Sequence, residues 1–277
     1  MKLNRRIFTL ATTAALALST GAAFAGEALD RIMAAGTLKV ATDANWAPQS
    51  FINDNNEMDG FDVDVAREIA KRMGVEVEFV TPSWDIITAG RWNGRWDLSV
   101  GSMTPTLSRA EVLTFPGVYY FTPASIAVHK DSPFETIADL NGKAVGAGTA
   151  TTFELYLQHD LQIDAEGVPA FEYQLTAENK SYKDSTAAMD DLRLGDGVRL
   201  NGMVGSLPAI LSAIEANYPL RVLGDPVFYE PLALAIDKGD DELNDKLAAM
   251  LEEMKADGTL SALSVKWYGI DYSSTSE

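Results

Sequence analysis

The sequence predicts an α/β protein made of two units, each with a mostly parallel sheet, that face each other across a cleft. Three observations support this fold class. Short apolar strands alternate with amphipathic helices over residues 37–100, an order that produces a parallel sheet with right-handed crossovers. The same alternation starts again after residue 121. No Pro-rich or low-complexity linker separates the units, so close strand-like crossings and a hinge are expected.

The first unit is defined by a change of periodicity from strand to helix and back. Residues 75–80 alternate apolar and polar side chains with period two, as a half-buried strand does. Val65, Ile69 and Met73 form one helical stripe, and Gly74 follows as a stop signal. The predicted elements are strands over 37–41, 75–80 and 96–100 and helices over 62–73 and 84–92.

The second unit repeats this pattern less regularly. The predicted strands cover residues 125–128, 143–147, 171–173, 203–204 and 220–222, and the helices cover 151–157, 185–194 and 207–216. A strand over 232–236 and helices over 241–257 and 260–268 follow. These last elements are too few to form a core alone, so we expect them to pack on one of the two units.

The composition of the 277-residue chain excludes several classes of function. It has no Cys, two His and a net charge of −18. Without Cys there is no disulfide, thiolate nucleophile or Cys-based metal site, and two His leave little for a His-based site. Nucleic acid is not expected as a partner, because phosphate binding needs clustered Lys and Arg. We expect neither a metal ion nor a cofactor.

The N-terminus has the three parts of a secretory signal peptide. Three basic residues precede an apolar run over residues 7–18, and Ala23-Phe24-Ala25 forms a cleavage site. We assign residues 1–25 to a cleavable signal peptide in preference to a membrane anchor, because the apolar run is short for a span of ~20 residues. The sequence therefore predicts a soluble mature protein in the periplasm. The export route, Sec or twin-arginine, stays open.

Four segments carry the side chains best suited to binding a ligand. They are residues 43–48, 84–85, 101–109 and 148–152. Each lies at the carboxyl end of a predicted parallel strand or in the crossover that follows it, where ligands of open α/β sheets bind. The candidate site residues in them are Asp43, Trp46, Trp84, Ser102, Thr104, Arg109, Thr151 and Thr152.

These side chains suit a small zwitterion. The planar guanidinium of Arg109 matches a carboxylate, and Ser102 and Thr104 offer hydroxyl and backbone N–H groups. Thr151 and Thr152 stand at a predicted helix N-terminus, where free N–H groups also favour an anion. The two Trp rings offer flat faces to an apolar or cationic ligand, and the Asp is suited to a positive group.

Each candidate also has a purely structural interpretation. Arg109 could pair with Glu111 at the surface, Thr151 could cap a helix, and Ser102 and Thr104 could be turn residues. The two candidate Trp side chains could belong to the core. Taken singly, these residues therefore leave binding and structural roles open.

Five further residues look suited to chemistry but are assigned to structure. Trp92, Trp96 and Trp267 are predicted to pack in the core. Asp62 and Asp64 resemble a metal-binding pair. The helix dipole favours acids in the first turn of a helix, which is the preferred explanation for both.

Taken in order, the candidate segments form part of a longer series of motifs. The series consists of residues 36–43, Trp46-Ala47-Pro48, residues 60–66 and 96–97, Ser102-Met103-Thr104 with Arg109, and residues 145–146, 151–154, 255–260 and 266–269. This series resembles the periplasmic solute-binding proteins of polar amino-acid ABC transporters, the family-3 type. The resemblance covers essentially the whole mature chain.

The resemblance implies the two-lobed periplasmic-binding-protein fold of type II, with a hinge and an interlobe cleft. Lobe 1 would comprise residues 26–121 and 231–277, and lobe 2 residues 122–230. The protein would be a monomer that closes around one amino acid or amino-acid derivative. It would deliver this ligand to the permease subunits of an ABC transporter in the membrane.

The resemblance also implies roles for the candidate residues by position. Arg109 would take the ligand carboxylate. Ser102, Thr104 and Thr152 would help to hold the carboxylate and the amine. The two candidate Trp rings would flank the ligand side chain, and Asp43 would border that part of the pocket.

Two departures from the family pattern bear on the ligand. Ala150 stands where the family loop has a Gly, and Ala lacks the freedom of Gly at positive φ. Ser206 stands where the second-lobe strand of the family ends in an Asp that binds the α-amino group. Either another acid, such as Asp43 or Glu230, meets the amine, or the ligand lacks a free primary amine.

Two other functions fit the same scaffold. An enzyme resembling the periplasmic cyclohexadienyl dehydratases would need a general acid facing the cleft, and the cleft segments show no paired acid and base. A sensor lobe feeding a receptor would need a partner to supply membrane and signalling segments. The binding protein is preferred, since function follows from the site and not from the fold.

Overall fold

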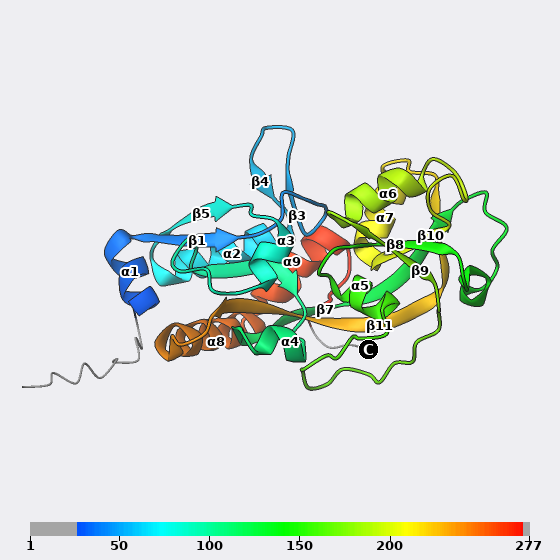
Figure 1. The fold of residues 1–277 in the computed structure, drawn as a ribbon. Helices are drawn as coiled ribbons and strands as arrows, with labels where there is room; N and C mark the ends of the chain where they lie inside the picture. The colour runs from blue at the N-terminus through cyan, green and yellow to red at the C-terminus, as the bar shows by residue number, and fades with distance from the viewer. Residues whose placement is uncertain (1–26, 274–277) are drawn as a thin grey trace, which may run out of the picture.

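The computed structural model describes residues 27–273. The predicted signal peptide over residues 1–25 lies outside the described residues. Two sheets organise the described part of the chain: a small sheet of three strands, and an eight-stranded sheet with the order β5-β1-β6-β11-β7-β10-β8-β9. Figure 1 shows the large sheet running through both halves of an elongated molecule, with helices packed along it.

The first half of the large sheet is parallel, as predicted. β1 pairs with β5 on one side and with β6 on the other, both in parallel register. The elements of this half are α1 (Glu27–Ala35), β1 (Thr37–Ala41), α2 (Phe61–Met73), β5 (Glu76–Val80), α3 (Trp84–Thr88), β6 (Leu98–Met103) and α4 (Leu107–Ala110). The helix predicted over 84–92 is shorter, because α3 ends at Thr88 and Trp92 is buried in the loop that follows.

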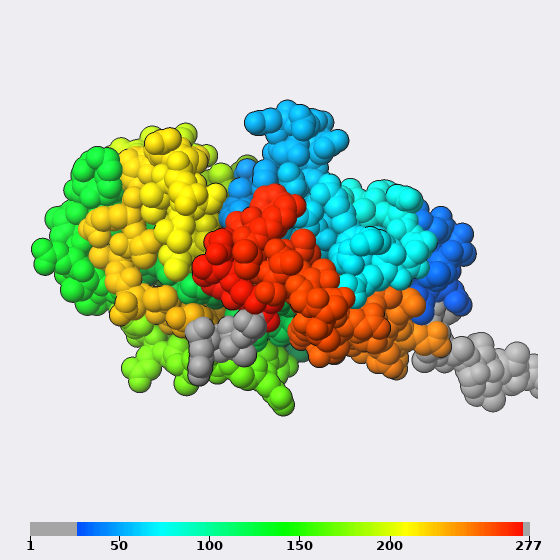
Figure 2. Space-filling view, turned by 180° about the vertical axis from the view of Figure 1, so that it is seen from behind, coloured from blue at the N-terminus to red at the C-terminus, as the bar shows by residue number. Residues whose placement is uncertain are grey.

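A hairpin stands out from the first half. Its strands are β2 (Asn45–Trp46), β3 (Ser50–Ile52) and β4 (Met58–Asp59), which form the three-stranded sheet. In Figures 1 and 2 the hairpin projects from the top of the molecule. Its base follows β1 directly, so it begins at the carboxyl end of a parallel strand.

Two long antiparallel strands connect the halves, as the sequence led us to expect. β7 (Leu113–His129) and β11 (Leu220–Asp237) pair from end to end with three irregularities, the largest between Leu223 and Phe228. β11 also pairs with β6 of the first half, and β7 pairs with β10 (Gly202–Ser206) of the second half. The short strands predicted in these regions are parts of the two crossings.

The second half continues the sheet with parallel strands. β8 pairs in parallel with both β10 and β9. Its further elements are η1 (Ile137–Leu140), β8 (Ala144–Gly148), α5 (Thr152–Leu157), β9 (Glu178–Tyr182), α6 (Ser185–Leu192) and α7 (Leu207–Glu215). The helices predicted in this half all occur, with ends that differ by one or two residues.

One predicted strand, over residues 171–173, is wrong. The chain forms no strand there, and the edge strand of this half is β9, with the polar sequence Glu-Asn-Lys-Ser-Tyr. Phe171 and Tyr173 instead pack their rings against Tyr156. The aromatic alternation therefore reflects a cluster of side chains, whereas β9 is held by backbone pairing with β8.

The C-terminal helices pack on the first half. Apolar residues of α8 (Asp241–Ala256) and α9 (Thr259–Tyr268) share one core cluster with residues of α2 and β1. Leu251 of α8 packs so closely on β7 that a Cβ on Gly117 would lie 2.8 Å from it. The second half has core clusters of its own. Figure 2 shows α9, in red, across the middle of the molecule.

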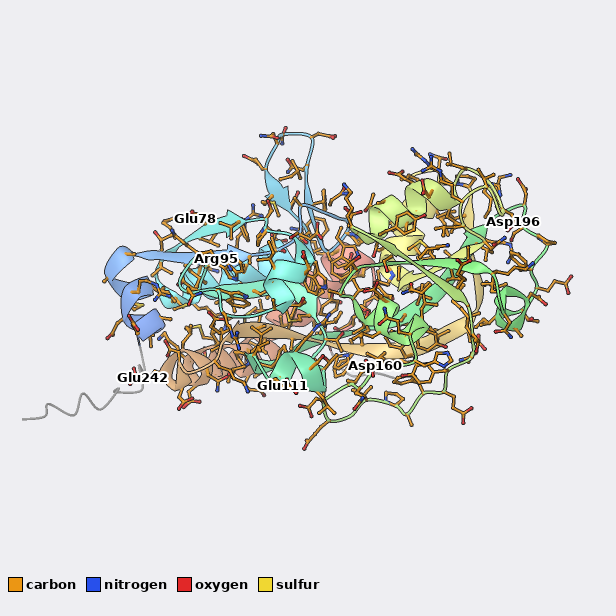
Figure 3. All side chains as sticks on the ribbon, in the orientation of Figure 1. Glu78, Arg95, Glu111, Asp160, Asp196 and Glu242 are labelled. Carbon is orange, nitrogen blue, oxygen red and sulfur yellow. The ribbon has the colours of Figure 1, made fainter. Side chains whose placement is uncertain are left out.

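Acidic side chains are spread over the surface of both halves. Glu78, Glu111, Asp160, Asp196 and Glu242 are all exposed and mark well-separated positions in Figure 3. Among residues 27–273, no helix combines the length and the apolarity needed to cross a membrane.

Candidate functional site

A cavity lies between the two halves, at the carboxyl ends of the parallel strands. It holds about 540 Å³ of empty space, part of it open to solvent. Its walls come from the segments after β1, β5, β6, β8 and β9 and from the crossing strand β11. The lining residues are Asp43, Asn45, Trp46, Trp84, Ser102, Thr104, Arg109, Thr149, Thr151, Thr152, Phe153, Lys183, Asp184, Ser185 and Glu230.

Eight of the nine residues predicted from the sequence line this cavity. The ninth, Ser206, ends β10 and lies outside the lining. Its hydroxyl accepts a hydrogen bond of 3.1 Å from Nε2 of Gln49, and both side chains are buried. Ser206 therefore joins the second half to the first without facing the cavity.

Arg109 is a buried cation in the wall of the first half. The hydroxyl of Thr106 accepts a hydrogen bond of 3.2 Å from its backbone N–H and so caps α4. Arg109 is 5% exposed, which rules out the alternative of a surface pair with Glu111. Burial lowers the pKa of Arg109 to about 10, while the charge of Glu230 acts in the opposite direction. The side chain is therefore a cation at neutral pH.

The guanidinium of Arg109 reaches across to the second half. It donates to the backbone oxygen of Thr104 at 2.8 Å and to that of Ala150 at 2.7 Å. It also lies 5.5 Å from the ring centroid of Trp84, within the range of a cation–π contact. These contacts hold its plane against the Trp ring at the edge of the cavity.

The loop after β8 completes this contact between the halves. Ala150 has a φ of 61°, in the left-handed region that favours Gly. The Ala nevertheless adopts this conformation where the family loop has a Gly. Its carbonyl accepts a bond from Nε1 of Trp84 at 3.2 Å in addition to the bond from Arg109. Its N–H donates to Glu154 at 2.8 Å. The Ala is therefore tolerated at this position. Its carbonyl group links the two halves, because both of its donors, Trp84 and Arg109, belong to the first half.

Glu230 brings a carboxylate into the cavity from the crossing strand β11. It is 3% exposed, and its Oε1 accepts hydrogen bonds from the hydroxyls of Thr152 and, at 2.9 Å, of Thr104. Burial raises the pKa of Glu230 to about 7, although the two hydroxyls and the charge of Arg109 act in the opposite direction. Since Thr104 belongs to the first half and Thr152 to the second, Glu230 connects both.

A second buried carboxylate lies behind the cavity wall. Asp62 is fully buried in the first turn of α2 and accepts bonds of 2.7 Å from the hydroxyls of both Ser102 and Tyr119. The hydroxyl of Tyr120 also contacts that of Ser102. Burial raises the pKa of Asp62 to about 7 against the effect of these bonds. The predicted place in the helix is correct, but Asp62 is bonded to core side chains as well.

The second half contributes charged residues at the start of α6. Asp184 caps this helix, because its Oδ1 accepts a bond of 2.7 Å from the backbone N–H of Ala187. Nζ of Lys183 lies 3.5 Å from its other oxygen. Asp43 also lines the cavity, where burial raises its pKa and the charge of Asp184 adds to that shift.

Sequence reasoning missed Lys183, Asp184 and Ser185. They follow β9, and the rule that selected the other segments would have selected these as well. The strand wrongly predicted over 171–173 hid their position. An acidic N-cap in front of a helical pattern was the available signal.

Trp46 and Thr151 combine structural and cavity-lining roles. Trp46 lines the cavity and also packs against a core cluster of the second half, and its Nε1 has no hydrogen-bond partner within the described chain. The Thr151 hydroxyl accepts a bond from the N–H of Glu154 at 3.2 Å and donates to the Gly148 carbonyl at 2.6 Å. The helix-cap interpretation of Thr151 is therefore correct.

The arrangement suits a small molecule that carries charges of both signs. A cation, Arg109, and an anion, Glu230, both reach the cavity, and two Trp rings supply flat faces. In the described part of the chain, no group of three or more His, Cys, Asp or Glu is placed to hold a metal ion. The fold and the site define a two-lobed binding protein with its ligand cleft between the lobes.

Comparison with known proteins gives the family. The profile of the bacterial extracellular solute-binding proteins, family 3, matches residues 38–270. This match covers most of the chain, and the chain belongs to that family. Members of the family are periplasmic binding proteins of ABC importers.

Relatives of known name and structure agree with this assignment. The L-cystine-binding protein TcyJ of Escherichia coli strain K12 is 31% identical over 252 residues, covering 90% of this chain and 89% of the relative. The ancestral amino acid-binding protein AncCDT-1, described as a precursor of cyclohexadienyl dehydratase, is 32% identical with a TM-score of 0.75, covering 87% and 99% of the chains. An ancestral arginine-binding protein bound to arginine is 30% identical with a TM-score of 0.74, covering 84% and 99%. The type II periplasmic-binding-protein fold expected from the sequence is confirmed.

Proposed function

We propose that the protein closes around one amino acid or amino-acid derivative and delivers it to the permease subunits of an ABC importer. The observation that carries this proposal is the cavity that Arg109 and Glu230 share with Trp46 and Trp84. A cation, an anion and flat faces complement the carboxylate, the ammonium and the side chain of an amino acid. Relatives named for cystine and arginine binding support the ligand class.

The carboxylate end of the ligand is assigned to Arg109. Its guanidinium has more N–H donors than the carbonyl groups of Thr104 and Ala150 occupy. Donors therefore remain for a carboxylate, and burial strengthens a charge-assisted bond of this kind. Thr152 and Ser102 also line the cavity.

The remaining predicted residues shape the rest of the cavity. Trp46 and Trp84 flank the ligand side chain, and Asp43 borders that region. Thr151 holds the start of α5 in place through its capping bonds. Ser206 contributes through its bond to Gln49, which joins the second half to the first.

The two halves are proposed to move as lobes about the crossing strands β7 and β11. Lobe 1 comprises residues 26–121 and 231–277, and lobe 2 comprises residues 122–230. The separate core clusters of the two halves support this division. A ligand that contacts both lobes shifts the equilibrium toward closure by its differential affinity for the closed state.

The proposed place of action is the periplasm, where the protein works as a monomer after removal of residues 1–25 as a signal peptide. The basic and apolar segments of the N-terminus support the export signal. The location of the family members supports the compartment.

The test is a thermal-shift screen of the purified protein against amino acids, opines and betaines, followed by isothermal titration calorimetry. A ligand present at 100 times its Kd should raise the free energy of unfolding by about 2.7 kcal/mol. No stabilisation by any compound in the panel would contradict the proposal. Mass spectrometry of ligand retained during purification gives an independent identification.

One observation favours a second candidate, an enzyme resembling the cyclohexadienyl dehydratases. Glu230 is a buried carboxyl in the cleft, and burial raises its pKa to about 7, as a general acid at neutral pH requires. AncCDT-1, to which this chain is similar, is itself named as an amino acid-binding protein and as a precursor of that enzyme. Turnover of prephenate or arogenate, lost in Glu230→Gln, would establish it, whereas binding of amino acids without turnover would exclude it.

A further inference from the structure

We propose that Glu230, on the crossing strand β11, holds the ammonium group of the ligand and makes this protein select molecules with a free amine. The inference rests on the proposed function, since it names the group that recognises one end of the amino acid. Strand β10 ends at Ser206, at the position where the family has an Asp for the amine. Ser206 is uncharged and lies outside the cavity lining. Recognition of a cation must therefore come from another element.

The geometry of Glu230 leaves one of its oxygens for a ligand. The hydroxyls of Thr104 and Thr152 both donate to Oε1, and Oε2 accepts no hydrogen bond from the described part of the chain. Glu230 lines the cavity, so Oε2 is an open acceptor for an N–H group. No Lys or Arg among residues 27–273 forms an ion pair with this carboxylate. A ligand ammonium would supply the positive partner that the buried Glu230 carboxylate lacks.

The other acids are less suited to this role. Asp43 is half-buried, and its Oδ1 already accepts a bond of 2.7 Å from the backbone N–H of Asn45. Both oxygens of Asp184 are engaged, one in capping α6 and one by Lys183. Asp62 is absent from the cavity lining. Of these acids, Glu230 alone combines deep burial, a place in the lining and an unused oxygen.

The placement of Arg109 complements Glu230. The charge of Arg109 acts on Glu230, yet the guanidinium bonds to backbone carbonyls and the two side chains form no ion pair. The cavity therefore presents a positive and a negative group that are not paired with each other. An α-amino acid carries a carboxylate and an ammonium on one carbon, which matches this arrangement.

The hydroxyl contacts couple the ammonium site to closure. One donor to Glu230, Thr104, comes from the first half, and the other, Thr152, comes from the second. The carboxylate is oriented by both donors only when the halves are together. An ammonium bound at Oε2 would therefore be recognised most strongly in the closed state, which is the state a binding protein must stabilise.

The experiment compares two ligands on two proteins by isothermal titration calorimetry. The probe is whichever proteinogenic L-amino acid, or L-cystine, binds the wild-type protein most tightly, and its partner is the α-hydroxy acid with the same side chain. Glu230→Gln should weaken binding of the amino acid by about 30- to 1,000-fold, because it removes one partner of a buried charged contact. It should change binding of the α-hydroxy acid by less than about threefold, since that ligand carries no ammonium. Glu242→Gln, the same change at an exposed position of α8 outside the cavity lining, is the matched control and should leave both affinities unchanged.

Each outcome separates the inference from the proposed function. An amino-acid affinity unchanged in Glu230→Gln, or an equal loss for both ligands, overturns the inference and leaves the binding function standing. A wild-type protein that binds no amino acid contradicts the proposed function itself. If Glu230→Gln does not fold by circular dichroism, Glu230→Asp replaces it. This variant should reduce the preference for the amine at least about tenfold, because its carboxylate is shorter by one methylene.

Discussion

Glu230 and Asp62 are two buried carboxylates that contact the same short segment, Glu230 at Thr104 and Asp62 at Ser102. Glu230 is 3% exposed and Asp62 is fully buried. Burial raises the pKa of each to about 7. Glu230 nevertheless lines the cavity and keeps one oxygen free, while both oxygens of Asp62 accept bonds from core hydroxyls.

This difference shows that burial and pKa alone do not identify a binding carboxylate. Asp62 and Tyr119 hold Ser102, whose φ of 52° is unfavourable for a residue other than Gly. Asp62 therefore maintains the shape of the cavity wall. Glu230 can exchange bonding partners with a ligand, because its free oxygen faces space and not protein.

The largest effect is expected from removing the cation opposite Glu230. Arg109→Met should weaken amino-acid binding about 100- to 5,000-fold, since truncation of a desolvated charge contact costs about 3–5 kcal/mol. Titration calorimetry measures this loss. Arg221→Met is the matched control, because Arg221 also bonds to backbone carbonyls but lies outside the cavity lining. A Kd of Arg109→Met within about threefold of the wild type would contradict the assigned role.

The next effect concerns stability and tests whether Asp62 has a structural role. Asp62→Ala should lower the free energy of unfolding by about 2–4 kcal/mol, because it leaves the hydroxyls of Ser102 and Tyr119 without an acceptor in the core. The midpoint of thermal unfolding should fall by about 5–15 °C. Glu242→Ala, which removes an exposed acid from the first turn of α8, is the control and should cost less than about 1 kcal/mol. An equal loss of unfolding free energy in both variants would contradict the structural role of Asp62.

The pH dependence of stability should contain a contribution from each carboxylate. The pKa of both groups is raised in the folded protein to about 7. Between about pH 4 and 7 the folded state therefore binds protons that the unfolded chain has released, and stability falls as pH rises through this window. Glu230→Gln and Asp62→Asn should each remove part of the fall, at most about 1.4 kcal/mol per pH unit. Urea unfolding at several pH values measures it, and unchanged slopes in both variants would contradict it.

The pH dependence of binding should belong to Glu230 alone. An ammonium binds the ionised carboxylate, so affinity should rise by up to about tenfold per unit as the pH approaches 7 and then level off. Glu230→Gln should flatten this profile, and Asp62→Asn should retain it. The other charged groups in the lining are Asp43, Arg109, Lys183 and Asp184. A profile retained in Glu230→Gln but lost in Asp43→Asn would transfer the ammonium site to Asp43.

The smallest effect is expected at the loop that joins the halves. Ala150→Gly should raise the free energy of unfolding by up to about 1 kcal/mol, because Gly adopts the φ of 61° without steric cost. Differential scanning calorimetry should show a midpoint higher by about 2–4 °C. Ala147→Gly, in the neighbouring strand β8, is the control and should lower the midpoint. A lower midpoint in both variants would show that Ala150 carries no strain.

Local periodicity predicted most of the helices and the central strands, but it missed the hairpin strands, the edge strand β9 and the full length of β7 and β11. α2 has the apolar stripe of Val65, Ile69 and Met73 on its buried side, and Gly74 ends it with a φ of 74°. The prediction of a strand over 171–173 was wrong, because aromatic alternation also arises where rings cluster on a loop. The true edge strand β9 is polar, and its conformation comes from pairing with β8.

The site was predictable as far as it depends on strand ends. Eight residues chosen by this rule line the cavity. The rule missed Lys183, Asp184 and Ser185, because it selects residues after a predicted strand and the strand before them, β9, was not predicted. Glu230 lies inside a strand, so no local pattern could separate it from the other acids, although the sequence named it as one alternative.

The sequence by itself determined the α/β class, the order of elements and the sets of residues at the strand ends, because periodicity records which face of each element is apolar. Only the tertiary structure decided which carboxylate faces the cavity and which faces the core. That choice depends on the pairing of β7 with β11 and on the approach of segments far apart in the chain, such as Thr104 and Glu230. Such contacts follow from packing of the whole molecule, which no local pattern contains.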